Sequence, residues 1–262
     1  MATKSWVIWI IVIVAVIGAG FGGWWWYSHS RVGADEPTST TSNTQLTVKQ
    51  GWNFIAFPYN VPSTIANLEI KFGTTIKLEA MYRWSGSTWI DAMGEASVKP
   101  GTGYLAYFSQ GGTVDLGNTQ EVDYKKVEVP LAANEWQLVG KPLLGTVQFR
   151  SSSSSSTSYL PYTGLAVKLT DGTTVSTLDA IAKGYIKTPL FLENSNPSYS
   201  YVKLYDLSGN SFPDFNGAWV KPLSANVESL VFDTQGQAGS ASISRETLET
   251  ADSGGTVAPS TP

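Results

Sequence analysis

The sequence lacks cysteine, and its single histidine, His29, lies just after a long hydrophobic run. Without cysteine there are no disulfides, thiolate nucleophiles or cysteine-ligated metals, so ordinary burial must hold the fold. One histidine excludes a multi-histidine metal centre and disfavours a histidine-based catalytic triad. We therefore expect a non-catalytic protein with no cofactor and no metal ion.

Charge is also scarce, because Asp, Glu, Lys and Arg make up 15% of the 262 residues and the formal net charge is −4. No basic block is present, so the electrostatic footprint of a phosphate-binding protein is missing and no nucleic-acid partner is expected. The remainder is rich in Trp, Tyr, Val, Thr, Gly and Ser. This composition suits half-buried strands and tight turns and predicts an all-β protein.

One hydrophobic run is long enough to matter for localisation. Residues 6–27 contain no Asp, Glu, Lys or Arg, and as a helix at about 1.5 Å per residue they extend roughly 33 Å, enough to cross a bilayer. Aromatic rings suited to headgroup depth stand at both ends of the run: Trp6, Trp9, Trp24, Trp25, Trp26 and Tyr27. We predict a short cytoplasmic tail at 1–5 and a transmembrane helix at 6–27 in contact with membrane lipid.

A cleaved signal peptide is the alternative for this run. Lys4 supplies a charged start, residues 6–17 an apolar core, and Gly18-Ala19-Gly20 a small-residue cleavage site. Cleavage would leave the tryptophans of residues 24–26 near a soluble N-terminus, whereas a retained helix places them at the lipid surface. A retained anchor is therefore favoured.

The orientation of the anchor is set weakly by charge, because Lys4 on one side is balanced by Arg31 on the other. The short N-terminal tail and the acidic Asp35 and Glu36 beyond the run favour a single-pass signal-anchor whose C-terminal part is extracytoplasmic. Residues 28–45 are polar and rich in Thr, Ser and Asn, and they predict a flexible stalk.

Internal similarity divides the rest of the chain into two modules, at 46–128 and 129–232. Trp52–Pro58 matches Trp136–Pro142 as a strand that ends at proline, and Ser63–Leu68 matches Ser176–Ile181 as the start of a capped helix. Each module therefore has one short helix. We predict two tandem β-sandwich-like modules.

Further matches complete the predicted repeat. Tyr82–Trp89 matches Tyr205–Phe212 as a hairpin about a Ser-Gly turn, and Gly103–Ala106 matches Ala218–Lys221 as a final aromatic strand. The second module carries an insertion near 143–171, including a run of six serines. Beyond Phe232 the composition is polar and Gly-rich, and it predicts a disordered tail at 233–262.

The pattern resembles a loosely defined repeat of secreted and surface-anchored prokaryotic proteins. The matching segments are the Gly51-Trp52-Asn53 strand, the Tyr82–Trp89 hairpin and the Pro100–Tyr104 turn and strand. The second copy departs from the pattern, because Phe215-Asn216-Gly217-Ala218 replaces the Pro-Gly-x-Gly turn. The resemblance implies cell-surface architecture or adhesion, and it leaves the ligand open.

Aromatic residues are the main site candidates. Trp52, Trp136, Tyr104 and Trp219 recur at matching places, which favours a shared structural role in the core. The candidates for ligand contact lie near turns or in the insertion, where rigid rings can face outward; they are Trp84, Trp89, Tyr107, Tyr159, Tyr162, Tyr199 and Tyr201.

Two other chemistries have weaker support. Oxygen ligands for calcium are available at Asp206, Ser208, Asn210 and Asp214, but they lack the EF-hand spacing. Carboxylates for glycoside cleavage, Asp91 and Glu95 foremost, form no diagnostic motif. The expected function is that of a membrane-anchored surface protein for adhesion, envelope structure or assembly with an exported partner. Carbohydrate binding through exposed aromatic rings is the alternative, and an anchored glycoside hydrolase ranks last.

Overall fold

The computed structural model describes residues 44–262 except 60–63, 118–123, 196–197, 254–257 and 260–262. The described residues all belong to one compact unit. The predicted cytoplasmic tail, the transmembrane helix with its interface aromatics and most of the stalk therefore lie outside the described residues. Within the described ranges, the helices are too short or too polar to span a bilayer.

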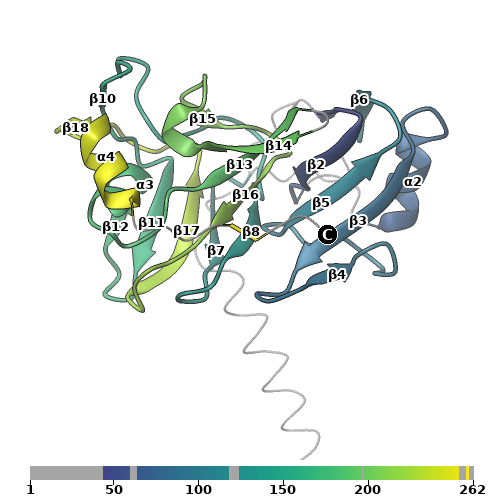
Figure 1. The fold of residues 1–262 in the computed structure, drawn as a ribbon, viewed down its shortest axis with the longest axis horizontal. Coiled ribbons are helices and arrows are strands. Elements are labelled where there is room, and N and C mark those ends of the chain that lie inside the picture. The colour runs from purple at the N-terminus through teal and green to yellow at the C-terminus, as the bar shows by residue number, and fades with distance from the viewer. Residues whose placement is uncertain (1–43, 60–63, 118–123, 196–197, 254–257, 260–262) are drawn as a thin grey trace, which may run out of the picture. The chain divides into compact units, whose positions relative to one another are not determined.

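The described chain is mostly β, with antiparallel sheets and a few short helices (Figure 1). The β-rich class predicted from composition is confirmed. The first half contains β1 (Gln45–Val48), β2 (Gly51–Ala56), α2 (Ile65–Phe72), β3 (Leu78–Trp84), β4 (Trp89–Asp91), β5 (Gly103–Phe108) and β6 (Gly112–Asp115).

The second half is longer because of its insertion. Its elements are β7 (Lys126–Pro130), β8 (Gln137–Gly140), β9 (Val147–Gln148), β10 (Ser158–Tyr159), β11 (Leu165–Leu169), β12 (Thr174–Ser176), α3 (Thr177–Ala182), β13 (Leu190–Ser195), β14 (Ser198–Lys203), the 3-10 helix η1 (Leu204–Asp206), β15 (Ser211–Phe212), β16 (Gly217–Val220), β17 (Val227–Asp233), β18 (Ile243–Ser244) and α4 (Arg245–Asp252).

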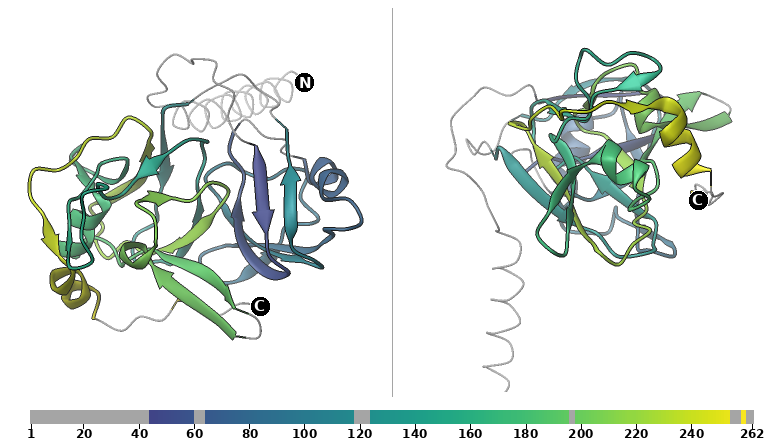
Figure 2. Two further views of the ribbon diagram at one scale, coloured as in Figure 1. Left: turned by 90° about the horizontal axis from the view of Figure 1, so that it is seen from above. Right: turned by 90° about the vertical axis from the view of Figure 1, so that its left-hand side faces the viewer.

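The two halves have the same strand order. The first half forms the sheet β2-β5-β3-β4 and the pair β1-β6, and the second half forms the sheet β8-β16-β13-β14 and the pair β7-β17. In the second half the hairpin β11-β12 extends the pair to β12-β11-β17-β7. The halves lie side by side (Figure 2).

Both predicted helices are confirmed, and each has a hydroxyl cap, although Thr64 caps the first helix in place of the predicted Ser63. The Thr64 side chain accepts a hydrogen bond from the Asn67 amide at the start of α2. Ser176 accepts one from the Asp179 amide at 3.0 Å and donates one to the Asp179 carboxylate at 2.5 Å, which is close to a capping box.

The Gly51-Trp52-Asn53 motif shapes the turn between β1 and β2. Gly51 has a φ of +92°, a conformation that favours glycine. The Asn53 side chain accepts from the Lys49 amide at 2.9 Å and donates to the Lys49 carbonyl at 2.8 Å. One side-chain amide thus closes the turn on both sides and fixes where β2 begins.

The predicted hairpin at Tyr205–Phe212 is wrong. Residues 204–206 form η1, and Ser211 and Phe212 pair with β9 of the insertion. The counterpart of the β3-β4 hairpin is β13-β14, because β13 pairs with β16 as β3 pairs with β5. The Ser-Gly and aromatic pattern matched locally, but non-local strand pairing decides which segment occupies the position.

The predicted match of the final strands is offset by one residue. Ala56 pairs with Gly103, and Gly140, which matches Ala56 in the sequence, pairs with Gly217. Gly103 therefore corresponds to Gly217 rather than to Ala218. Because side chains alternate between faces, this offset assigns every ring on the strand to the other face.

The predicted boundaries change at two places. β7 spans the proposed boundary at 128/129 and pairs with β17, so it belongs wholly to the second half. The predicted disordered tail contains β18 and α4, and Leu248 of α4 is fully buried in the core of the second half. Salt bridges from Arg245 to Asp206 (2.6 Å) and from Lys203 to Asp252 (2.7 Å) also hold α4.

The central strands are covered on both faces, which explains why adjacent residues are buried. Ile55 and Tyr104 face a core that includes α2, whereas Phe54 on the neighbouring position faces a different cluster. In the second half Val139 faces the core that includes α3, and Leu138 faces the same cluster as Phe54. Each half therefore has a core of its own, to which Leu144 and Phe215 of the second half contribute in the case of the first half, and a third cluster is shared.

The halves join by reciprocal contacts between equivalent positions. The Gly140 amide donates to the Gly101 carbonyl at 2.9 Å, and the Ala56 amide donates to the Phe215 carbonyl at 2.8 Å. Gly101 corresponds to Phe215 in the structural register, and both have positive φ, +83° and +56°. A contact in which each side offers the same positions is isologous, the arrangement of a two-fold dimer.

Close approach at this junction requires small residues. A Cβ on Gly140 would lie 2.5 Å from the Ala56 Cβ and 2.5 Å from the Thr102 carbonyl oxygen. A Cβ on Gly217 would lie 3.3 Å from the Gly103 Cα. The junction therefore tolerates little added volume, because the atoms it would meet are largely backbone.

We expect Gly140→Ala to destabilise the protein by about 1–3 kcal/mol, since the added methyl group overpacks the junction. Gly94→Ala is the matched control, because no heavy atom lies within 4 Å of a Cβ at Gly94. Urea denaturation of both variants checks this. Equal stability of the two variants would contradict the close junction.

Candidate functional site

The cluster shared by the two halves, here called the aromatic cluster, is built from equivalent positions. The register pairs Trp52 with Trp136, Phe54 with Leu138, Leu105 with Trp219, Trp84 with Leu192, and Trp89 with Tyr201. These residues, together with Leu190 and Ala258, make up the cluster. Aromatic residues occupy one or both positions of every pair named, so the junction is lined by rings from both halves.

Trp219 is the centre of the cluster and is fully buried. Its ring lies 5.5 Å from Trp84 and 5.6 Å from Trp89 in edge-to-face contacts, and Phe54 meets it at 5.9 Å. Trp84 and Trp89, which are cross-strand partners, are 5.3 Å apart. Such pairs contribute about 0.5–1.5 kcal/mol each beyond burial, so the cluster stabilises the junction.

The cluster also presents polar groups to its interior. The buried indole N–H groups of Trp84 and Trp136 have no hydrogen-bond partner among the described residues. The Tyr201 hydroxyl donates to the Pro259 carbonyl at 3.1 Å. Burial raises the pKa of Tyr201, and the neighbouring Trp219 indole opposes that rise, so the hydroxyl stays protonated as a donor at neutral pH.

The structure brings three of the seven predicted ligand residues together, namely Trp84, Trp89 and Tyr201. Tyr107 lies on the same face of the sheet and contacts Trp52 at 5.1 Å. Tyr159 is 1% exposed and packs in the core of the second half, so its ring is closed to a ligand. Tyr162 is half-buried outside the cluster, and the side chain of Tyr199 lies outside the described residues.

Trp136 and Trp219 were predicted to lie in the core. Trp219 also joins two of the predicted candidates, Trp84 and Trp89, and Trp136 packs against Trp219. Ala258 and Pro259 were missed, because they lie in the segment predicted to be disordered. An Ala-Pro pair next to Thr and Val was the only local signal available.

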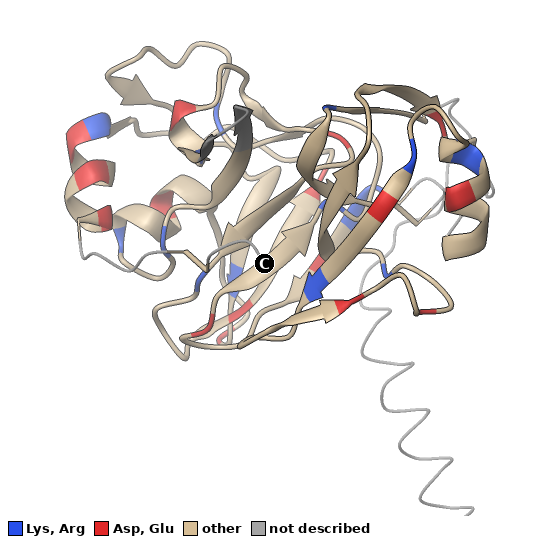
Figure 3. Cartoon of the chain, turned by 45° about the vertical axis from the view of Figure 1, so that its right-hand side comes forward, with Lys and Arg blue, Asp and Glu red and all other residues tan. Residues whose placement is uncertain are grey.

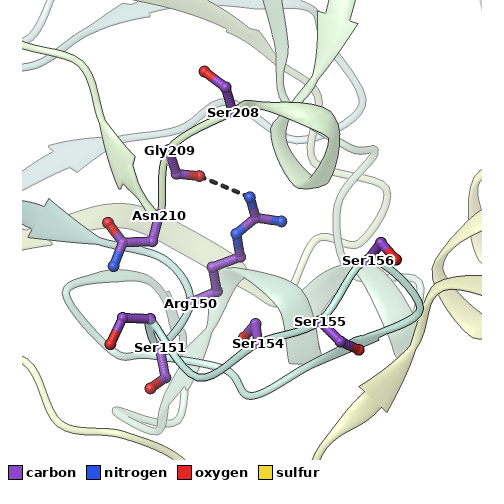
Figure 4. A pocket seen from close by; sticks show the side chains of 9 residues that line it. Arg150, Ser151, Ser154, Ser155, Ser156, Ser208, Gly209 and Asn210 are labelled. Atoms are coloured by element: carbon purple, nitrogen blue, oxygen red, sulfur yellow. Dashed lines mark hydrogen bonds between the residues drawn. The ribbon is translucent and has the colours of Figure 1, made fainter.

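The serine run forms the wall of a hollow rather than an unstructured loop. The hollow has a volume of about 470 Å³. Serines of the run line one side of it and the turn at 208–210 lines the other (Figure 4); the lining serines of the run are Ser151, Ser152, Ser154, Ser155 and Ser156. The loop is held by its own hydrogen bonds: the Ser151 amide donates to the Leu160 carbonyl at 2.8 Å, and the Leu160 amide donates to the Ser154 hydroxyl at 2.9 Å.

Arg150 lies in the centre of this hollow, but its charge is committed to the fold. Its guanidinium donates to the carbonyls of Tyr205 (2.9 Å), Leu207 (2.7 Å) and Gly209 (2.8 Å). The same group lies over the Tyr159 ring at 5.2 Å. Arg150 therefore fixes η1 and the following turn, and it is not a free anion-binding group.

The weaker chemistries gain little from the structure. Asp214 pairs with the buried Lys141, and Asp206 pairs with Arg245, so two of the four proposed calcium ligands face cations instead. No group of three or more metal-binding side chains occurs in the described part of the chain. Of the glycosidase candidates, Glu95 pairs with Arg83, and Asp91 accepts a hydrogen bond from the Met93 amide at 2.8 Å.

Lys141 has a structural role that follows from its position. It corresponds to Phe57 of the first half and is 1% exposed. Its ammonium donates to the Asp214 carboxylate and to the carbonyls of Gly145 and Phe212. Burial lowers the pKa of Lys141, and the Asp214 carboxylate opposes that lowering. With three acceptors for three N–H groups, Lys141 secures the loop that carries Phe215.

Comparison of the chain with protein-family models, with curated proteins and with solved structures found no match. The charged side chains on the helices lie within one half each: α2 carries Glu69 and Lys71, and α4 carries Arg245 followed by three acidic residues (Figure 3). The aromatic cluster, in contrast, unites residues from both halves.

We expect Arg150→Lys to lower stability by about 1–3 kcal/mol, because an ammonium cannot replace the forked donors that reach three carbonyls. Limited proteolysis should then cut near the serine run sooner than in the parent. Ser152→Ala, at an exposed position of the same loop, is the control and should change neither measurement. Unaltered stability of Arg150→Lys would refute the structural role.

Proposed function

We propose that this chain is a non-catalytic, membrane-anchored surface protein that binds an exported protein partner through its aromatic face. The aromatic face comprises the aromatic cluster with Tyr82 and Tyr107, which lie on the same side of the first sheet. In this proposal residues 6–27 span the cell membrane once, the C-terminal part is extracytoplasmic, and the two halves are tandem β-sandwich-like modules. Adhesion, envelope structure and assembly all use such a protein.

The observation that carries the proposal is the half-buried set of rings on a rigid frame. Trp52, Trp84, Trp89, Tyr107 and Tyr201 are each partly exposed. Aromatic residues are enriched in protein interfaces, because they bury a large area at low cost in conformational entropy. The frame is preorganised, since Trp52 and Tyr107 lie on the central strands β2 and β5, whose opposite face packs on the core of the first half.

Carbohydrate binding is the second candidate. It is favoured by the neighbouring rings of Trp52, Tyr82 and Tyr107 on one face of the sheet, with centroid distances of 6.0 Å and 5.1 Å from Trp52. Against it, the Trp52–Tyr107 contact is edge-to-face, and the rings about Trp219 turn toward one another. A sugar platform needs an open ring face, so protein binding is preferred.

The anchored topology is tested with Ser240→Cys, which adds one thiol at an exposed position of a chain that has no cysteine. A membrane-impermeant maleimide should label intact cells expressing the full chain, and the protein should resist carbonate extraction. Labelling that requires lysis, or release as a soluble protein, would overturn the anchored topology.

Partner class is tested in the same cells with a photo-crosslinking residue in place of Tyr107 and, as control, of Ser240. We expect one exported protein to be captured recurrently from Tyr107 and not from Ser240. Saturable binding on a glycan array that is lost in Tyr107→Ala would instead establish the carbohydrate alternative.

A further inference from the structure

One member of the aromatic cluster comes from outside the repeated strands. Ala258, 8% exposed, packs in the cluster although the register assigns it no equivalent in the first half. The short yellow stretch at 258–259 lies near β8 in Figure 1. The end of the chain therefore reaches back onto the shared face, and it departs from the two-fold pattern there.

The contact has the chemistry of peptide recognition. The small Ala258 side chain is buried among rings, and the next residue, Pro259, receives a hydrogen bond from the Tyr201 hydroxyl on its carbonyl at 3.1 Å. Proline-containing segments bind to aromatic-lined surfaces in this way, because they are already extended and lose little entropy when bound.

The cluster holds unused donors beside this contact. Trp136 is 8% exposed, and its indole N–H has no partner in the described ranges. The indole N–H of Trp84 is also buried without a hydrogen-bond partner among the described residues. A buried donor without a partner is costly, and backbone carbonyls of an extended segment are suitable acceptors.

We propose that the aromatic face is a docking site for an extended Ala-Pro segment, filled in cis by residues 258–259 and able to accept the same segment from a second copy. The inference rests on the proposed function, and it identifies the partner as another molecule of this chain. A second copy is the expected partner because its residues 258–259 are identical to the segment that already binds this face in cis.

Exchange between copies depends on local concentration. Five residues, 253–257, separate Asp252 at the end of α4 from Ala258. Such a short tether gives an effective concentration in the millimolar range, so a dilute competitor loses to the attached segment. Copies confined to one membrane surface meet at high local concentration, where exchange links one molecule to the next.

The experiment measures binding of a fluorescein-labelled peptide of residues 253–262 by polarisation. The full chain in detergent is compared with the chain lacking residues 258–262 and with that truncated chain carrying Tyr201→Phe. Because the attached segment competes, we expect the truncated chain to bind at least about tenfold more tightly than the intact chain. Tyr201→Phe should weaken binding by about two- to tenfold, the loss of one hydrogen bond.

A peptide in which Ala258→Glu and Pro259→Gly are combined is the control and should not bind. Equal binding to the intact and truncated chains would place the peptide elsewhere and overturn the proposal, as would equal binding of an unrelated polyproline peptide. Absence of binding by a folded truncated chain would also overturn it. An exported partner of different sequence captured from Tyr107 would leave the proposed function standing, so the two failures are distinguishable.

A second measurement covers the case in which truncation prevents folding. Ala258→Cys in the full chain should react with maleimide at least about tenfold more slowly than Ser240→Cys, and adding the peptide in excess should speed its labelling by displacing the attached segment. Rapid labelling of Ala258→Cys without the peptide would show that the face is not occupied in cis.

Discussion

The fold depends on the close approach of two backbones at the junction of its halves. Gly140 lies against Ala56, and Gly217 against Gly103, so that amides of each half reach the carbonyl of a left-handed residue in the other. Larger residues at these positions would separate the strands. Because the strands meet, β2, β5, β8 and β16 acquire a second covered face, and a single compact unit results instead of two independent domains.

The aromatic cluster follows from this junction. Side chains that would face solvent on an isolated half instead meet their equivalents, with Trp219 in the position that Leu105 occupies in the first half. The two halves contribute equivalent positions to the cluster, but the residues at those positions differ. Ala258, near the end of the chain, packs on the cluster and has no equivalent in the first half. The combination gives a rigid, partly exposed set of rings together with buried indole donors.

Sequence reasoning succeeded where the signal is local. The strands at Trp52 and Trp136 and the Ser176 cap depend on neighbouring residues, and these features are present. For the first half, sequence reasoning predicted the helix, but its cap is Thr64, one residue beyond the predicted Ser63. It failed for Tyr205–Phe212, whose Ser-Gly turn resembles that of a hairpin, because strand pairing is decided by distant residues. It also failed for the tail, since one buried Leu248 and two salt bridges order a segment whose composition is polar. The rings of the site were predicted, but their convergence on Trp219 was not, because the inter-half junction leaves no local pattern.

Scanning calorimetry on the protein in detergent tests the junction most directly, because cooperativity reports whether the halves share one structure. One transition, with the calorimetric enthalpy equal to the van't Hoff enthalpy, is expected for the compact unit that contains both halves. Two resolved transitions, one for each half, would show that the halves fold separately and would contradict the shared junction.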